Sequence, residues 1–209
     1  MIVHDVEQRS PEWYALRAGM PTASEFSKIV TSKGEASKTV ETYAISLAAE
    51  LYAGKPVDAW EGNAWTERGR ELEDAALTQY GFVNECEVKP IGFITNDLGS
   101  MGCSPDGLVS DDGMVEIKCL KAENHVKALL YFNKHGKCPT TYAAQTQGQI
   151  LIAERAWCDL VFYHPDLPPL TIRQEPDKAI VDGLIATLPK LMTERDLVLA
   201  VLKTAGGVE

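Results

Sequence analysis

The stretch from Ser104 to Cys119 decides the fold and reads Ser-Pro-Asp-Gly-Leu-Val-Ser-Asp-Asp-Gly-Met-Val-Glu-Ile-Lys-Cys. Two runs of strand-forming residues, 108–110 and 114–119, flank Asp-Asp-Gly. This pattern predicts a β-hairpin with a loop at 111–113 and Gly113 in the left-handed region. Side chains on a strand alternate between faces, so this register places three charged residues on one face and three others in a core. The charged set is Asp106, Glu116 and Lys118, and the core set is Val115, Ile117 and Cys119.

Two carboxylates and a lysine on one strand face form a recognisable chemical set. Hard cations such as Mg²⁺ take oxygen ligands and keep several waters, which suits one or two carboxylates beside a substrate phosphate. Such a metal makes its bound water a better nucleophile, and a lysine can orient that water or stabilise charge on the phosphate. A solvated polar face would explain Glu116 and Lys118 alone. Pro105-Asp106 followed by both across a hairpin is more specific.

A second charged group is expected near the N-terminus. Ser10 and Pro11 begin a short helix that Gly19 ends, and residues 22–25 form a capping box for a helix to about Val30. Arg17 would then lie near the hydroxyl of Ser24 and free backbone N–H groups, which together suit an anion. Alternatively, Arg17 simply complements the end of its own helix, and this pair alone does not separate the two readings.

The remaining pattern alternates strands and helices. One predicted helix, 141–154, places Tyr142, Gln145 and Gln149 on one face at spacings of three and four. The other helices are expected at 39–53, 63–80 (ended by Gly81), 124–132 and 177–204 (kinked or broken at Pro189). Strands are expected at 83–88, 91–95, 100–103, 156–163 and 170–174.

Composition limits the class of protein. The 209 residues are 45% hydrophobic, enough for a substantial core in one domain, residues 1–209, and the sequence shows neither a membrane span nor a signal peptide. Five widely spaced cysteines indicate reduced thiols rather than a disulfide framework, zinc site or iron–sulfur cluster. The net charge of −10 opposes DNA binding over the whole surface, but residues 113–173 carry seven Lys and Arg against five Asp and Glu. Any DNA contact is therefore expected to be local and concave.

These motifs resemble a known family. Pro105-Asp106 and Glu116-Ile117-Lys118 are similar to the metal-binding core of the PD-(D/E)xK nucleases, and residues 103–107 with 116–119 are closer still to the phage lambda exonuclease family. Leu16-Arg17-x-Gly19-x-x-Thr22-Ala23-Ser24 resembles that family's N-terminal motif, Gly69 to Glu73 its Gly-x-x-x-Glu segment, and residues 142–147 its final motif.

The resemblance covers about 13–164 and implies roles for single residues. Asp106, Glu116 and the Ile117 backbone carbonyl would hold metal, with Glu73 acting on the metal or through water. Lys118 and Gln145 would position the attacking water, with Gln147 in place of Gln145 if the register differs. The 5′-phosphate of DNA would be held by Arg17, Ser24 and Ser104.

The resemblance also implies an α/β fold with a restriction-endonuclease-like core, a mixed central β-sheet flanked by helices. The implied activity is a Mg²⁺-dependent exonuclease, with Mn²⁺ able to substitute, that degrades linear double-stranded DNA from a 5′-phosphorylated end. The remaining 3′ strand would pass to a single-strand annealing recombination protein. A homotrimeric ring and a cytoplasmic location, in the bacterial host if phage-encoded, complete the expectation.

Two alternatives share the core residues. A site-specific restriction-type endonuclease would need base-reading side chains and commonly two-fold symmetry. A non-catalytic DNA-end binding module would use a structural cation, but such a site gains nothing from Lys118. The residue that separates the DNA strands is not identified, although Trp60, Trp65 and Thr66 lie in the corresponding region.

Overall fold

The computed structural model describes residues 1–57 and 64–207. Of the residues considered for strand separation, Trp60 lies outside these ranges, and the side chains of Trp65 and Thr66 are also outside the description. Within the described ranges, no helix is both long and apolar enough to cross a lipid bilayer. The five cysteines are free thiols.

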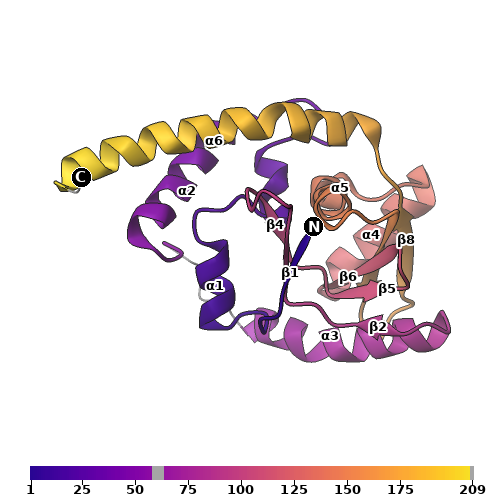
Figure 1. The fold of residues 1–209 in the computed structure, drawn as a ribbon. Coiled ribbons are helices and arrows are strands. Elements are labelled where there is room, and N and C mark those ends of the chain that lie inside the picture. Colours follow the sequence, from indigo (N-terminus) through magenta and orange to yellow (C-terminus); the bar gives the residue numbers. More distant parts are fainter. Residues whose placement is uncertain (58–63, 208–209) are drawn as a thin grey trace.

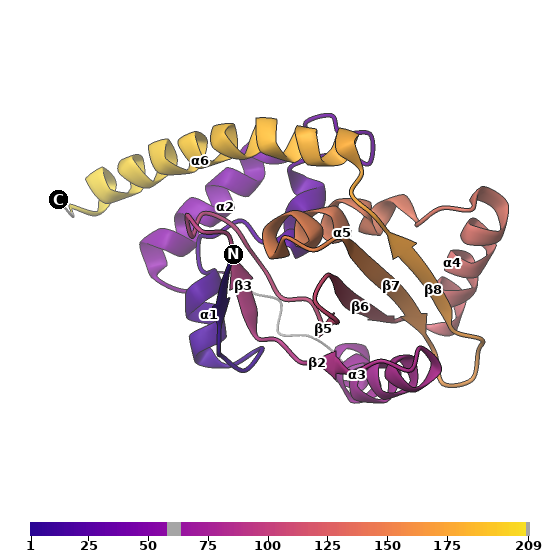
Figure 2. The same ribbon diagram turned by 45° about the vertical axis from the view of Figure 1, so that its right-hand side comes forward.

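A five-stranded mixed sheet forms the centre of the molecule (Figures 1 and 2). Its order is β2-β5-β6-β7-β8, in which β6 and β7 are parallel and the other neighbours are antiparallel. The bounds are β2 Val88–Lys89, β5 Gly107–Val109, β6 Gly113–Cys119, β7 Trp157–Tyr163 and β8 Leu170–Gln174. The predicted α/β fold with a mixed central sheet is confirmed.

Helices cover both faces of this sheet. Helix α3 (Ala64–Val83) packs on one face, where Val115 and Ile117 of β6 meet Ala76 and Tyr80 of the helix. The opposite face of β6 and β7 is covered by α4 (Ala122–His135) and α5 (Thr140–Ala153). Figure 2 shows α3 and α5 on opposite sides of the sheet. The predicted core side of β6 is therefore the side that faces α3.

The N-terminal part of the chain packs beside this central unit. Strands β1 (Ile2–His4), β3 (Phe93–Thr95) and β4 (Gly102–Cys103) form a three-stranded sheet. Helix α1 (Pro11–Arg17) follows β1, and the 3₁₀ helix η1 (Ala23–Lys28) packs against α5. Helices α2 (Val40–Ala53) and α6 (Lys178–Gly206) pack against each other (Figure 1).

The central hairpin forms in a register that differs from the predicted one. Leu108 pairs with Met114 and Val109 with Gly113, so the loop is 110–112. The left-handed residue is Ser110 (φ 54°), not Gly113. Gly113 is needed for space instead, because a Cβ there would lie 2.0 Å from the Trp157 ring. The pairing changes by two positions, which preserves the strand face because side chains alternate with a period of two.

Several predicted boundaries are wrong for local reasons. Helix α3 continues through Gly81 and ends at Val83. Of the strand predicted at 83–88, only Val88 lies in a strand, β2. Gly81 lies where the chain folds back, with the Cys86 N–H donating to the Gly81 carbonyl at 3.0 Å. Helix α6 continues unbroken through Pro189. Proline has no N–H to donate to the backbone carbonyl four residues earlier, but Pro189 is exposed, so water can hydrogen-bond that carbonyl instead.

The predicted capping box at residues 22–25 is also wrong. The Thr22 side chain makes no capping hydrogen bond, and the helix that follows is 3₁₀ rather than α. Instead, the Thr22 Oγ1 atom accepts a hydrogen bond from the Arg17 side chain at 3.2 Å. By contrast, the predicted cap of α1 forms, since Ser10 Oγ accepts from the Trp13 N–H at 3.2 Å.

Candidate active site

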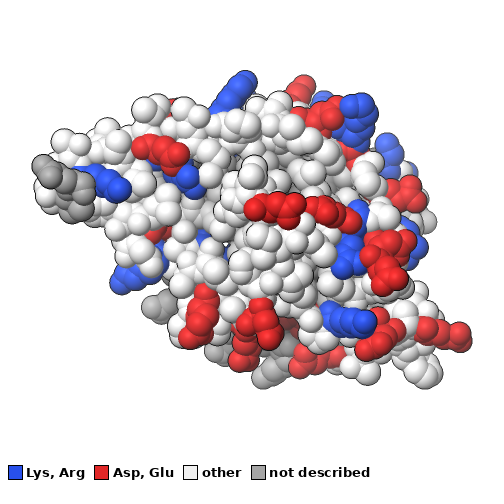
Figure 3. All heavy atoms as spheres, in the orientation of Figure 1, with Lys and Arg blue, Asp and Glu red and all other residues white. Residues whose placement is uncertain are grey.

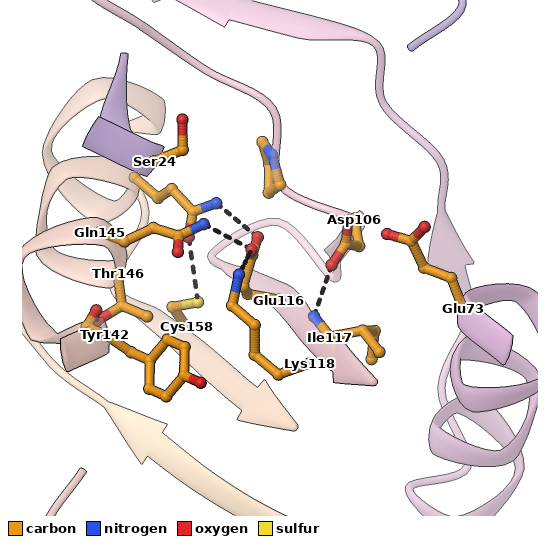
Figure 4. Close-up of polar contacts among 12 residues, drawn as sticks. Ser24, Glu73, Asp106, Glu116, Ile117, Lys118, Tyr142, Gln145, Thr146 and Cys158 are labelled. Atoms are coloured by element: carbon orange, nitrogen blue, oxygen red, sulfur yellow. Dashed lines mark hydrogen bonds and ion pairs between the residues drawn. The ribbon is translucent and has the colours of Figure 1, made fainter. Parts of the chain in front are cut away.

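Glu116 is the best-buried acid of the predicted set, with 4% of its surface exposed. Strand β6 directs it toward α5, and its two carboxylate oxygens accept three hydrogen bonds (Figure 4). Lys118 Nζ and Gln145 Nε2 donate to Oε1 at 2.7 and 2.6 Å, and Gln149 Nε2 donates to Oε2 at 2.6 Å. A buried carboxylate needs such partners to remain charged, so this part of the site is preorganised around a negative charge.

Lys118 lies two residues further along β6 and therefore on the same strand face as Glu116. Burial alone would lower the pKa of its ammonium group, but the charge and hydrogen bond of Glu116 outweigh this effect and raise it. Its ammonium nitrogen also lies 5.7 Å from the centre of the Tyr142 ring. Lys118 is therefore held as a cation beside the acids.

Asp106 precedes β5 and lies across from Glu116. Its Oδ2 accepts a hydrogen bond from the Ile117 backbone N–H at 2.6 Å. Burial, followed by the negative charges of Glu116 and Glu73, raises the pKa of Asp106 well above its ordinary value. Three acids thus converge where a positive charge would relieve their repulsion.

Glu73 comes from α3 and faces Asp106 from the side away from Glu116 (Figure 4). The Arg9 guanidinium Nη2 donates to Glu73 Oε2 at 2.9 Å. Helix α3 therefore places an acid beside Asp106, although the helix packs on the face of the sheet opposite α5.

The predicted anion-binding residues also come together. Arg17 Nη2 donates to Thr22 Oγ1 and Ser24 Oγ at 3.2 and 3.3 Å, and its guanidinium lies 4.0 Å from the centre of the Trp13 ring. Trp13 in turn donates from Nε1 to Ser104 Oγ at 2.8 Å. Burial lowers the pKa of Arg17, though a guanidinium remains charged at any physiological pH. Arg17, Ser24 and Ser104 thus form one connected polar group.

One cavity of about 240 Å³ joins the two groups. Its lining contains all the predicted acids, the lysine, Gln145 and the three predicted phosphate-binding residues. The full lining is Gln8, Arg9, Trp13, Arg17, Ser24, Glu73, Ser104, Asp106, Glu116, Ile117, Lys118, Gln145 and Gln149. We call it the catalytic cavity below.

The donor set fits a hard divalent cation. Asp106, Glu116 and Glu73 supply carboxylate oxygens. Burial and then the charges of Glu116 and Glu73 raise the pKa of Asp106, and a bound cation would neutralise those charges. The described residues contain no preformed group of three His, Cys, Asp or Glu ligands in contact distance. A hard divalent cation keeps several waters and needs few protein oxygens.

Two glutamines next to Gln145 have different roles. Gln147 points away from the catalytic cavity, where its Nε2 donates to the Glu175 carbonyl at 2.8 Å and its Oε1 accepts from the Asp177 N–H at 2.6 Å. It therefore fixes the start of α6, and Gln145 is the residue of this pair at the site. Gln149 also reaches the site, and the sequence pattern placed it on the face of Gln145 without revealing its acceptor, Glu116.

Comparison with known proteins agrees with this geometry. The sequence model of the YqaJ-like viral recombinase domain matches residues 12–156. The chain belongs to the YqaJ-like viral recombinase family. A search of curated proteins gave no match.

Solved structures of exonucleases are similar to this YqaJ-like protein. An alkaline exonuclease (LHK-Exo) from Laribacter hongkongensis is 30% identical with a TM-score of 0.81, and the alignment covers 95% of this chain and 98% of that one. The same enzyme in complex with dAMP matches equally well. A phage-related exonuclease from Haemophilus somnus 129PT shares the fold at 17% identity and a TM-score of 0.69, over 88% of this chain and 96% of that one. The YqaJ-like protein is thus a phage-type exonuclease, and its predicted relationship to the lambda exonuclease family is confirmed.

Proposed function

We propose that this exonuclease degrades one strand of linear double-stranded DNA from a 5′-phosphorylated end with the help of Mg²⁺. The observation that carries the proposal is the lining of the catalytic cavity, where Arg17, Ser24 and Ser104 share one space of about 240 Å³ with three acids. A strand whose terminal phosphate is held by Arg17, Ser24 and Ser104 can present only a bond near its end to the acids. This arrangement favours cutting from an end over cutting within a strand.

The metal would be held by Asp106, Glu116 and the Ile117 carbonyl, with Glu73 binding directly or through water. When bound, Mg²⁺ supplies a polarised phosphoryl oxygen and an activated water, and Mn²⁺ would replace it with the same oxygen ligands. Lys118 is positioned to stabilise charge on the phosphate, and Gln145 to orient the water. Gln149 holds the second oxygen of Glu116 in place.

The end group left by each cut follows from the anion site. To be held again by Arg17, Ser24 and Ser104, the shortened strand must carry a new 5′-phosphate. Water therefore attacks the phosphorus and the bond to the 3′ oxygen breaks, which releases a nucleoside 5′-monophosphate with a free 3′-hydroxyl. The complex of the Laribacter enzyme with dAMP, a nucleotide of this class, supports the proposal.

The surface charge supports a local DNA contact. Figure 3 shows acidic and basic side chains interspersed on one face, with no continuous basic patch among the described residues of that face. With a net charge of −10, a single chain would hold DNA weakly. We therefore propose a homotrimeric ring, closed by head-to-tail interfaces, that encloses the duplex and places Lys121, Lys127 and Lys134 toward it. The 3′ strand would pass to a single-strand annealing protein in the cytoplasm of the host cell.

The test uses linear duplex DNA with a label at one 5′ or one 3′ end, and closed circular DNA, each with Mg²⁺. We expect early loss of the 5′ label as mononucleotide, late loss of the 3′ label and an intact circle. Cleavage of the circle would support the restriction-type alternative, and DNA binding without any cleavage would support the end-binding alternative.

A further inference from the structure

Arg9 lines the catalytic cavity and has a strained backbone. Its backbone has φ 71°, a left-handed conformation that a bulky residue rarely adopts. The residues on both sides are anchored: Gln8 Nε2 donates to the carbonyls of Ile91 and Pro105 at 2.8 and 3.1 Å, and Ser10 caps α1. The backbone here is therefore fixed, and the fold would accept glycine at position 9 with less strain.

The ion pair between Arg9 and Glu73 does not stabilise the fold enough to explain the strained backbone at Arg9. Its guanidinium pairs with Glu73 at 2.9 Å, but 39% of the Arg9 side chain and 20% of the Glu73 side chain are exposed. Ion pairs in water contribute little to folding because solvent screens them. A strained backbone that supports a weak surface pair indicates a role in function instead.

The partners of the three acids show what that role is. Glu116 is bonded to Lys118 and two glutamine amides, and Asp106 to the Ile117 N–H. Among the residues that the structure describes, Arg9 is the cation that pairs with Glu73. A divalent metal that binds beside Glu73 would supply the same positive charge and make this contact unnecessary.

The released guanidinium would lie beside the DNA path. Arg9 lines the catalytic cavity together with Arg17, and it also lines the neighbouring cavity of about 630 Å³ between α1 and α2. Its planar fork of N–H donors matches the oxygens of a phosphodiester. Trp13 and Arg17 line both cavities as well, so a strand that runs from one to the other passes Arg9.

We propose that Arg9 is a phosphate-binding residue that exchanges Glu73 for an internal phosphodiester of the DNA strand when the metal binds. Arg9 thus neutralises Glu73 in the free enzyme and holds the strand backbone in the complex. This inference rests on the proposed function, because it assumes that a metal and a DNA strand meet in the catalytic cavity.

The test measures DNA affinity by fluorescence anisotropy over a series of NaCl concentrations. Ca²⁺, which also prefers oxygen ligands, replaces Mg²⁺, and gels verify that the DNA stays intact. The variants are Arg9→Gly, which relaxes the backbone, and Arg9→Gln, which keeps the length without the charge. Lys178→Ala is the control, because it removes one charge from another exposed ion pair, with Asp182.

We expect the slope of log affinity against log salt to fall by about 0.7–0.9 in both Arg9 variants, the value for one lost phosphate contact. The control should keep the wild-type slope. The loss should be equal on 5′-phosphate and 5′-hydroxyl duplexes, because Arg17 and not Arg9 lies in the terminal phosphate site. In calorimetric titration without DNA, Arg9→Gly should bind Mn²⁺ at least as tightly as wild type, because a competitor for Glu73 is gone.

Unchanged slopes in both variants, a loss confined to 5′-phosphorylated DNA, or weaker Mn²⁺ binding would each overturn the inference. Failure of the proposed function would be distinguishable, because the wild-type enzyme itself would then not digest linear DNA with Mg²⁺.

Discussion

Replacing Gln149 by methionine tests how the catalytic cavity is held together. Methionine has a similar length and no hydrogen-bond donor, so the change removes the 2.6 Å bond to Glu116 Oε2 without opening a large cavity. Lys118 and Gln145 both donate to Oε1. In Gln149→Met, Glu116 Oε2 therefore loses the hydrogen-bond donor that it has among the described residues.

The size of the effect follows from burial and charge. Gln149 is 1% exposed and Glu116 is 4% exposed, so water cannot easily replace the lost donor. A hydrogen bond to a charged group contributes about 1.5–3 kcal/mol, and each kcal/mol shifts the Tm of a domain this size by about 2–4 °C. We expect the Tm to fall by about 3–12 °C and the affinity for Mg²⁺ to fall about 10- to 100-fold, as for other groups that orient metal ligands.

The assay pairs thermal unfolding with calorimetric Mg²⁺ titration at a temperature where both proteins are folded. Gln147→Met is the matched control: it lies two residues away on α5 and loses two bonds to backbone groups at the start of α6. The control should lose stability and keep its Mg²⁺ affinity. Equal Mg²⁺ affinities for Gln149→Met and wild type would refute the reasoning, because Gln149 would then support only the fold.

Three further predictions address the charges and the assembly. Lys118→Ala should lower the single-turnover cleavage rate about 10²–10³-fold while Mg²⁺ still binds, since a preorganised charge is lost, and a near wild-type rate would remove Lys118 from the mechanism. Asp106→Asn should unfold at a higher temperature than metal-free wild type. The pKa of Asp106 is raised in the folded protein, so the stability that Asp106 contributes is complete below its pKa in the unfolded chain, about 4, and is lost as pH rises through the folded pKa. The difference in Tm between Asp106→Asn and metal-free wild type should therefore widen as pH rises. Mg²⁺ should narrow this difference in Tm, and a difference that does not depend on pH would contradict the account. Light scattering should give the mass of three chains, and a monomer or two-fold dimer would exclude the ring.

Strand alternation made the central acids predictable from the sequence. Asp106, Glu116 and Lys118 were expected on one face, and the observed pairing preserves that face because it changes by two positions. The loop itself was not predictable in detail. Gly113 is typical of a left-handed turn residue, but the Trp157 ring, which is distant in sequence, excludes a side chain there.

Other residues could not be assigned without tertiary structure. The sequence identifies Glu73 only through the family resemblance, since a helical glutamate is usually solvated. Gln149 shares a face with Gln145, but the periodicity of a helix does not identify an acceptor on a strand. The sequence gives no signal for Arg9, because a left-handed backbone at an arginine cannot be predicted from residue type. Similarly, Gly81 suggested a helix end, whereas it permits the close return of the chain at Cys86.

The most direct test of the central claim compares the initial rates on linear duplexes with 5′-phosphate and 5′-hydroxyl ends, in Mg²⁺, for wild type and Arg17→Ala. The claim is that the anion site and the metal site act as one cavity. Wild type should prefer the phosphorylated end, and Arg17→Ala should lose much of that preference while its Mg²⁺ affinity stays the same. Equal rates on both ends for wild type, or a preference that Arg17→Ala leaves unchanged, would contradict the account.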